Sequence, residues 1–201
     1  MSTMIKTLCG GMIAALASLS NAQAADAGAV SPGYVGADVG AVVYDGNTSA
    51  LTRVYGGRTI GTSAAFGLQQ VHALELMLYT ARLKRDSYNL YPADFIPGIR
   101  TRANGAAVSW TSSLNLNESW SLTSRLGVTF THAKSSFRGG AIYGADSWSR
   151  NSTGVIAGVG AAYKLSPNVS ATLDMNYMPI KVETYSKSDP ATVSVGLKYQ
   201  F

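Results

Sequence analysis

The closing stretch Val193-Ser194-Val195-Gly196-Leu197-Lys198-Tyr199-Gln200-Phe201 decides the fold class of this chain. Its odd-numbered positions are apolar or aromatic, and its even-numbered positions are small, polar or charged. Successive side chains of a β-strand point to opposite faces, so this segment is a strand with one apolar and one polar face. In water such an exposed apolar face would promote aggregation. It suits a strand that crosses a lipid bilayer.

Seven further segments repeat this alternation, and they are predicted as strands near residues 34–44, 53–60, 73–84, 100–116, 120–134, 154–165 and 169–180. A tilted membrane-crossing strand needs about 9–11 residues, which most of these segments reach. Short turns at 117–119 and 166–168 alternate with long polar segments at 85–99, 135–152 and 181–190. The pattern predicts an all-β fold, an eight-stranded antiparallel up-and-down transmembrane β-barrel. Residues 61–71 should form a short turn and are too many for one.

The N-terminus is predicted to be a secretory signal peptide, residues 1–24. Lys6 supplies the basic region, residues 8–19 are apolar, and Ala22-Gln23-Ala24 is an A-x-A cleavage site. The only cysteine, Cys9, lies in this segment, so the barrel domain expected at residues 25–201 has no disulfide. Cleavage near Ala24 would deliver an integral protein of a bacterial outer membrane.

Three motifs carry a family resemblance: Gly33-Tyr34-Val35-Gly36-Ala37-Asp38-Val39-Gly40, Ala73-Leu74-Glu75-Leu76 and Tyr199-Gln200-Phe201. Together with the signal peptide they resemble the OmpA-like family of small outer-membrane barrels. Because the chain ends at the barrel, the resemblance covers the barrel domain without the peptidoglycan-binding domain of some relatives. It also implies that the last strand, through Leu197, Tyr199 and Phe201, is the signal read by the barrel-assembly machinery.

Charged residues in the middle of the strands are expected to face inward, because an Arg on the lipid face at the midplane costs roughly 2–4 kcal/mol. Strand parity then predicts a lumen charge network of Asp38, Arg58, Glu75, Arg125, Lys164, Asp174 and Lys198. The interior of an eight-stranded barrel is just wide enough for side chains to fill, so these residues should form a polar plug. The alternative is a gate or proton path, since charges within a membrane often mark transport.

A second group of bases shares the outward parity at the loop ends of strands two to five. It consists of Arg53, Arg82, Lys84, Arg100, Arg102, His132 and Lys134. At headgroup height these residues would meet the phosphates of the surface leaflet. We therefore hypothesise a basic outer rim that contacts outer-membrane lipid and lipopolysaccharide; the alternative is that rim residues are charged simply because water reaches them.

No residues are predicted for catalysis, cofactor binding or metal binding. The two histidines, His72 and His132, fall at opposite ends of the predicted barrel, so they cannot share a metal site. Neither begins the His-x-Ser arrangement of lipid A deacylases. The positive charge is divided between rim and lumen, which argues against nucleic acid as a partner. The chain is therefore expected to have no enzymatic activity and no cofactor.

The expected function is that of a structural surface barrel that displays its loops. The predicted loops carry aromatic residues and arginines, which are favoured at binding surfaces: Tyr88, Tyr91, Phe95, Phe137, Tyr143 and Trp148 with Arg85, Arg138 and Arg150. Adhesion to a host or surface ligand is the leading interpretation. The alternatives are a narrow, porin-like channel for ions or small solutes and, behind it, a lipid-modifying barrel enzyme.

Overall fold

The computed structural model describes residues 32–44, 47–85, 88–91, 94–96, 99–137, 146–179 and 191–201. The predicted signal peptide and its cleavage site lie outside these residues. So do the side chains of Lys84, Arg85 and the aromatic residues predicted for the second loop. In the part of the chain that is described, no helix combines the length and the apolar character needed to cross a membrane.

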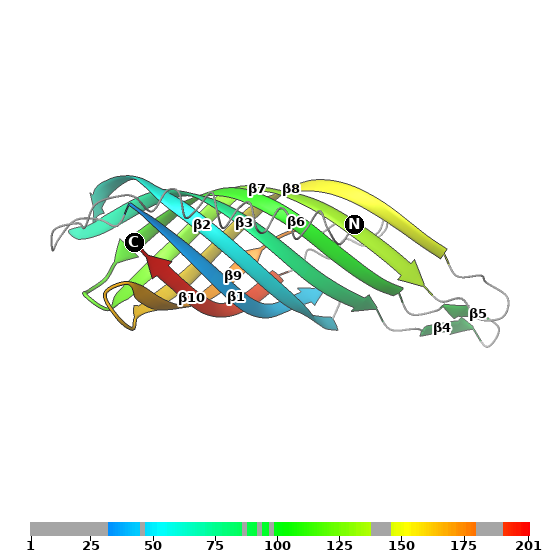
Figure 1. Ribbon diagram of the computed structural model, residues 1–201. Helices are drawn as coiled ribbons and strands as arrows, with labels where there is room; N and C mark the ends of the chain where they lie inside the picture. The colour runs from blue at the N-terminus through cyan, green and yellow to red at the C-terminus, as the bar shows by residue number, and fades with distance from the viewer. Residues whose placement is uncertain are drawn as a thin grey trace.

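Eight antiparallel strands close into a barrel (Figure 1), which confirms the predicted fold class. They are β1 (Gly33–Tyr44), β2 (Asn47–Ala65), β3 (Leu68–Arg85), β6 (Ile99–Asn115), β7 (Trp120–Phe137), β8 (Asp146–Lys164), β9 (Val169–Tyr177) and β10 (Ala191–Gln200). The order around the ring is β1-β10-β9-β8-β7-β6-β3-β2. Two short strands, β4 (Tyr88–Tyr91) and β5 (Asp94–Ile96), form a separate two-stranded sheet.

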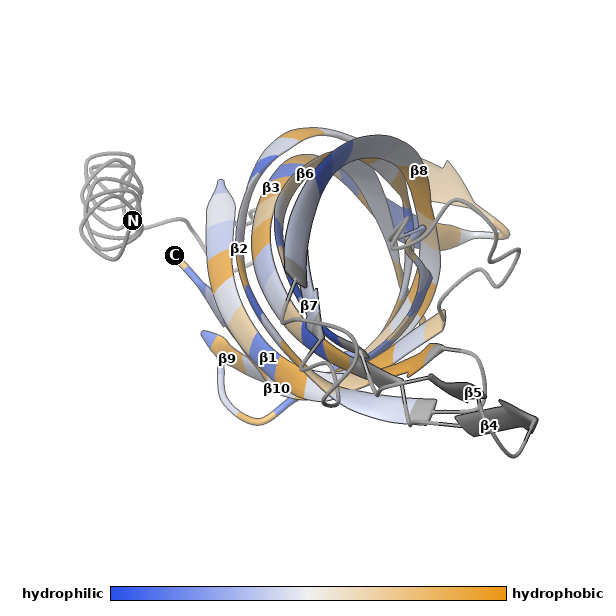
Figure 2. Cartoon of the chain, turned by 90° about the vertical axis from the view of Figure 1, so that its right-hand side faces the viewer, coloured by the Kyte–Doolittle hydropathy of each residue, from blue (hydrophilic) through white to orange (hydrophobic). Residues whose placement is uncertain are grey.

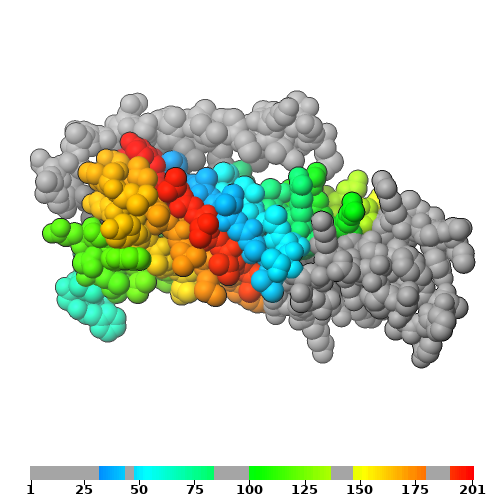
Figure 3. Space-filling model, turned by 90° about the horizontal axis from the view of Figure 1, so that it is seen from below, coloured from blue at the N-terminus to red at the C-terminus, as the bar shows by residue number. Residues whose placement is uncertain are grey.

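The ring closes where the last strand meets the first. Val35 lies opposite Tyr199, and Val43 lies opposite Ala191. Figure 3 shows this seam, with β10 in red beside β1 in blue and β2 in cyan. Each of the three strands turns alternate residues outward, as the closing stretch of the sequence predicts.

The β2–β3 hairpin is longer than the sequence predicts, because residues 61–65 and 68–71 are strand rather than turn. The turn is Phe66-Gly67, with φ of 55° and 75° at its two residues. Positive φ at both central residues is the two-residue geometry that matches the twist of a hairpin. The register shifts between Thr59 and Gly61, and such a bulge moves the following side chains to the other face. The bulge therefore hides the alternation that would have revealed the strand.

The barrel has a turn end and a loop end. The turn end carries Phe66-Gly67, residues 116–119, residues 165–168 and Phe201; the loop end is the opposite one. Toward the loop end β7 and β8 stay paired as far as Phe137 and Asp146. The predicted third loop, residues 135–152, is therefore largely strand.

The outer surface changes character partway along β3, β6 and β7. On β3, Leu74 and Leu76 are exposed while Glu75 is buried; nearer the loop end, Arg82 is exposed while Leu83 is buried. The apolar side chains thus move from the outside of the wall to the inside. Apolar residues face outward where lipid is the solvent and inward where water is the solvent. We call this change the polarity inversion, and it marks where the wall leaves the membrane.

The interior is divided at a corresponding level. The charged residues lie mostly toward the turn end, whereas a buried apolar cluster extends from the level of Tyr55 to the loop end: Val42, Leu51, Tyr55, Met77, Tyr79, Ala81, Leu83, Ala103, Ala107, Ala133, Ile156 and Met178. Figure 2 views the ring along its axis, with apolar and hydrophilic residues alternating along the strands. Side chains therefore fill the lumen at both levels.

The exposed apolar residues of the outer wall, such as Leu74, Leu126 and Val195, form an apolar belt around the barrel. Aromatic side chains lie at both borders of this belt. Near the turn end, the Trp120 and Tyr163 rings are 5.0 Å apart, and Tyr199 is exposed. Toward the loop end, Phe130 and Tyr177 are exposed. Amphipathic rings prefer the headgroup level, so these positions outline the two interfaces of a bilayer.

Candidate functional site

The lumen network has Arg53 at its centre. Its side chain is fully buried and opposes Asp38 in the β1–β2 register. Nη2 of Arg53 donates hydrogen bonds to Asp38 and Ser194, and to Asp174 Oδ2 at 3.3 Å. Its Nε and Nη1 are buried and have no partner within the described residues. One guanidinium nitrogen therefore ties together β1, β2, β9 and β10.

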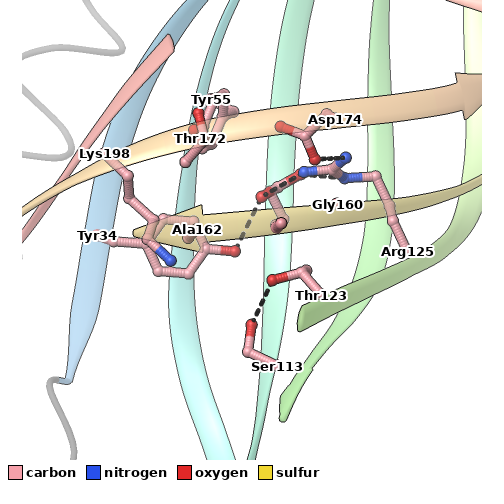
Figure 4. A pocket seen from close by; sticks show the side chains of 12 residues that line it. Tyr34, Tyr55, Ser113, Thr123, Arg125, Gly160, Ala162, Thr172, Asp174 and Lys198 are labelled. Atoms are coloured by element: carbon pink, nitrogen blue, oxygen red, sulfur yellow. Dashed lines mark hydrogen bonds and ion pairs between the residues drawn. The ribbon is translucent and has the colours of Figure 1, made fainter. Parts of the chain in front are cut away.

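Arg125 forms the second half of the network and extends from β7 toward Asp174 (Figure 4). Its Nε donates to Glu75 Oε1 at 2.8 Å, and its Nη1 donates to Asp174 Oδ1 at 3.1 Å. Nη1 also donates to Asn176 Oδ1 at 2.9 Å. Because Asp174 accepts from both arginines, the two halves form one connected network across the barrel.

Tyr34 and Lys198 complete the turn-end side of the lumen. The Tyr34 hydroxyl donates to Glu75 Oε2 at 2.9 Å, and Lys198 Nζ lies 5.4 Å from the centre of the Tyr34 ring. Lys198 makes no ion pair among the described residues. Lys164 has inward parity but is exposed at the turn end of β8, outside the network.

A cavity of about 30 Å³ adjoins this network and is lined by Glu75, Arg125, Asp174, Tyr34 and Lys198 among others. A site of this size holds one or two waters. Arg53 and Asp38 do not line it. The lumen thus contains a small polar cavity closed by ion pairs.

The structure corrects two assignments on β2. Arg53, predicted on the outer rim, is buried in the lumen, and Arg58, predicted in the lumen, is exposed on the outside. Arg58 lies opposite Gly33 at the start of β1, so it stands at the membrane border and avoids the cost of the midplane. Both faces of this stretch mix charged and apolar residues. Strand parity alone could therefore not decide whether Arg53 and Arg58 face the lumen or the outside.

Inward glycines of β8 make room for the network. A Cβ atom on Gly160 would lie 2.5 Å from Asp174 Oδ1, and one on Gly158 would collide with Asn176. Both neighbours belong to the ion-pair network. The glycines are therefore required by the size of the side chains opposite them.

The outer wall carries a row of bases just past the polarity inversion. Arg82, Arg102 and Lys134 lie directly opposite one another on β3, β6 and β7, and all three are exposed. We call them the basic row. Arg100 is exposed one step nearer the loop end, opposite the backbone of Lys84. Like charges directly opposite across strands destabilise a sheet, so this arrangement favours an anionic ligand that neutralises it.

A polar row separates the basic row from the apolar belt. Asn104, His132 and Asn151 are consecutive partners across β6, β7 and β8. His132 Nδ1 lies 2.7 Å from Asn151 Oδ1, and Thr80 donates to Asn104 Oδ1 at 2.8 Å. The sequence indicates His132 as a rim residue, but it does not reveal its two amide neighbours, because register across strands brings them together.

One pair of side chains resembles part of a hydrolytic site, and its residues are too far apart in the sequence to form a His-x-Ser motif. Ser63 Oγ lies 2.8 Å from His72 Nε2 on the outer wall near the turn end. Ser63 also donates to Gln70 Oε1 at 3.1 Å, and the His72 ring packs on Trp110 at 5.5 Å. His72 Nδ1 has no partner in the described part of the chain, whereas a catalytic base needs a group that orients it. The pair therefore lacks an element of catalytic machinery.

Metal ligands are likewise not assembled among the residues described. Within these residues, no group of three or more His, Cys, Asp or Glu side chains is placed to hold a metal ion. His72 and His132 lie near opposite ends of the barrel, as the strand order predicts.

A closed barrel with an apolar belt, two aromatic borders and a polar lumen defines a transmembrane barrel of the outer-membrane type. The family model of the outer membrane protein beta-barrel domain matches residues 12–201. The chain therefore belongs to this family, which places it in a bacterial outer membrane, as the resemblance to OmpA-like barrels implies. Short turns of such barrels face the periplasm and the longer loops face outward, so the loop end is the cell-surface end.

Solved structures of other small barrels share the fold. Ail, the attachment invasion locus protein of Yersinia pestis, is similar at a TM-score of 0.52 with 17% identity, covering 84% of this chain and 96% of Ail. A major outer membrane protein of Thermus thermophilus is similar at 0.51 with 16% identity, covering 84% and 99%. The N-terminal barrel of Pseudomonas aeruginosa OprF is similar at 0.50 with 11% identity, covering 84% and 97%. No curated protein matches the sequence.

Proposed function

We propose that this protein is a closed, non-enzymatic surface barrel that holds its loops above the outer leaflet for attachment. The polarity inversion carries the proposal, because it gives the wall beyond the membrane an apolar core of its own. On β7 about seven residues, from Phe130 to Phe137, continue past the belt. At roughly 3.3 Å per residue and a tilt near 40°, they raise the loop end by about 18 Å. The barrel then acts as a rigid support for its loops.

Attachment through the loops is supported by their composition. The predicted loops carry aromatic residues and arginines, including Tyr143 and Arg138 in residues 138–145. A second structure of Ail, similar at 18% identity and a TM-score of 0.50, is a complex with the heparin analogue sucrose octasulfate. We propose a similar preference for anionic surface ligands here.

Replacing residues 138–145 with a Gly-Ser segment of equal length tests this proposal. β7 and β8 remain paired up to Phe137 and Asp146, so the change leaves the barrel intact, which heat-modifiable gel mobility verifies. Cells displaying the native chain should bind a heparin-coated surface, and cells displaying the variant should bind it less. Equal binding by both, or none by the native chain, would contradict loop-mediated attachment to anionic ligands.

We further propose that the basic row contacts the phosphates of lipopolysaccharide and anchors the barrel in the outer leaflet. Its three bases are exposed beyond the polar row, on the side away from the apolar belt, where they could meet lipid phosphates. Neutralising Arg82, Arg102 and Lys134 together to Gln should weaken the binding of purified lipopolysaccharide. An unchanged affinity would disprove the anchoring role.

We also propose that the closing strand directs assembly. Leu197 and Tyr199 are exposed on the lipid face, and the Phe201 amide donates to the Gly33 carbonyl at the closing seam. Deleting Phe201 should reduce insertion by the purified barrel-assembly machinery more than spontaneous folding into detergent. Equal effects on both reactions would indicate a purely structural role.

A channel is the second candidate, and it is disfavoured because Arg53 and Arg125 bridge the lumen through buried ion pairs. Planar-bilayer recording of the refolded protein should show no conductance above the lipid background. Lipid A from expressing cells should keep an unaltered mass spectrum if the barrel has no lipid-modifying activity.

A further inference from the structure

An open groove of about 410 Å³ lies on the outer wall beside the basic row. Its lining residues come from β6, β7 and β8: Asn104, Phe130, Thr131, His132, Asn151, Ser152 and Thr153. The groove spans the border between the apolar belt and the polar row. A ligand there would touch lipid-level and water-level residues at once.

Three kinds of side chain follow one another up the wall at this place. The lowest level is apolar, with Phe130, Val128 and Val155 exposed by 54%, 43% and 53%. The next level is the polar row, and the highest is the basic row. Phe130, His132 and Lys134 represent these levels on β7, each two residues, or about 7 Å, above the last. An amphiphile aligned with the wall would therefore meet apolar, hydrogen-bonding and cationic surface in that order.

The polar row keeps hydrogen-bonding capacity for a ligand. The carbonyl oxygen of each amide is engaged, that of Asn104 by Thr80 and that of Asn151 by His132. The Nδ2 donors of both amides and His132 Nε2 have no partner within the described residues. Because His132 Nδ1 donates to Asn151 Oδ1, Nε2 is an acceptor in the neutral ring. Two amide donors and one imidazole acceptor match the hydroxyl groups of a sugar, whereas the basic row matches phosphate.

We propose that this groove binds one phosphorylated glycolipid of the lipid A class. Its acyl chains lie on Phe130 and Val155, its sugar lies against the polar row, and its phosphate lies on Arg102 and Lys134. This inference rests on the proposed lipopolysaccharide contact and adds to it a defined site that reads the sugar. An anionic phospholipid could use the basic row, but it has no sugar at the level of the amides.

The test uses the full mature chain in nanodiscs of zwitterionic lipid. Binding is measured with added lipid A, with phosphatidylglycerol and with inorganic phosphate as competitor. The groove variant is Asn104→Leu with Asn151→Leu. Its matched control is Thr48→Leu, an exposed outward position at the loop end of β2. Heat-modifiable mobility verifies that each variant is folded.

The groove variant should bind lipid A about thirtyfold more weakly, because it loses two hydrogen-bonding groups of about 1 kcal/mol each. Its binding of phosphatidylglycerol should stay unchanged, and Thr48→Leu should match the native chain for both lipids. The basic-row triple variant should lose affinity for both lipids.

Two results would overturn the groove site while leaving the anchoring role intact. One is unchanged lipid A affinity of the groove variant when the triple variant is weakened. The other is displacement of lipid A by inorganic phosphate at concentrations that also displace phosphatidylglycerol, which would reveal a simple anion site. Unchanged lipid A affinity of the triple variant would instead refute the anchoring role itself.

Discussion

Replacing Arg53 with Met is expected to destabilise the barrel by about 3–5 kcal/mol, the cost of removing one partner from a buried ion-pair network. Met keeps the unbranched stem of the side chain to about the position of Nε and lacks the guanidinium group. It leaves Asp38 buried with Thr172 Oγ1, at 3.4 Å, as its remaining side-chain donor. Asp174 keeps its bond to Arg125. The loss therefore falls mainly on Asp38.

Two structural details set the expected magnitude within this range. Arg53 and Asp38 do not line the cavity beside Glu75, and both side chains are fully buried, which favours the upper half of the range. Against this, Nε and Nη1 of Arg53 have no partner among the described residues, so the native site is incompletely satisfied. We expect about 4 kcal/mol.

Urea unfolding in lipid vesicles, followed by tryptophan fluorescence and gel mobility, measures this loss. With a urea m-value of about 2 kcal/mol/M, the midpoint should fall by about 2 M. Arg58→Met is the control on the same strand: this residue is exposed at the turn end and should change stability by no more than about 0.5 kcal/mol. Similar effects of the two substitutions would show that burial in the lumen network does not determine the stability of the barrel.

Three further changes test other parts of the structure. Gly160→Val should lower the unfolding free energy by about 1–3 kcal/mol, because the larger side chain overpacks against Asp174. Gly61→Val is the control and should be nearly neutral, because no atom beyond its chain neighbours lies within 4 Å of its Cβ position. Equal urea midpoints for the two variants would contradict the crowding at Gly160. Phe66→Asn should stabilise the hairpin by about 1 kcal/mol, since Phe66 has φ of 55° and is 96% exposed; a lower midpoint would mean that the ring makes a contact of its own. Glu75→Gln should lower the unfolding free energy without raising planar-bilayer conductance, and a rise in conductance would favour a gate over a strut.

The sequence predicts those parts of the fold where the solvent imposes a regular pattern. Residues 125–130 and the closing strand alternate cleanly, because one face meets lipid and the other meets the lumen. Their strands and faces agree with the structure. The residues Glu75, Arg125 and Asp174 also share the lumen, since a charge on the lipid face would be too costly.

The sequence could not predict what depends on register between distant strands. Arg53 faces Asp38 only because β1 and β2 pair with that offset, and its second acid, Asp174, is distant in the chain. The row of Asn104, His132 and Asn151 likewise arises from the alignment of three strands. The sequence does contain a signal for the apolar core of the loop end. On β3 the leucines occupy even positions in 74–78 and the apolar residues occupy odd positions in 79–84, so the apolar face changes from the outside to the inside.

The position of the seam has a consequence for how the chain matures. One edge of β1 pairs only with β10, where Val43 lies opposite Ala191. The first strand of the barrel is therefore fully paired only after the last strand has been added. A chain interrupted before β10 retains two unsatisfied edges, and pairing of such distant segments is slow. The barrel therefore closes only once the last residues of the chain are available, and until then its two open edges can pair with strands of other molecules.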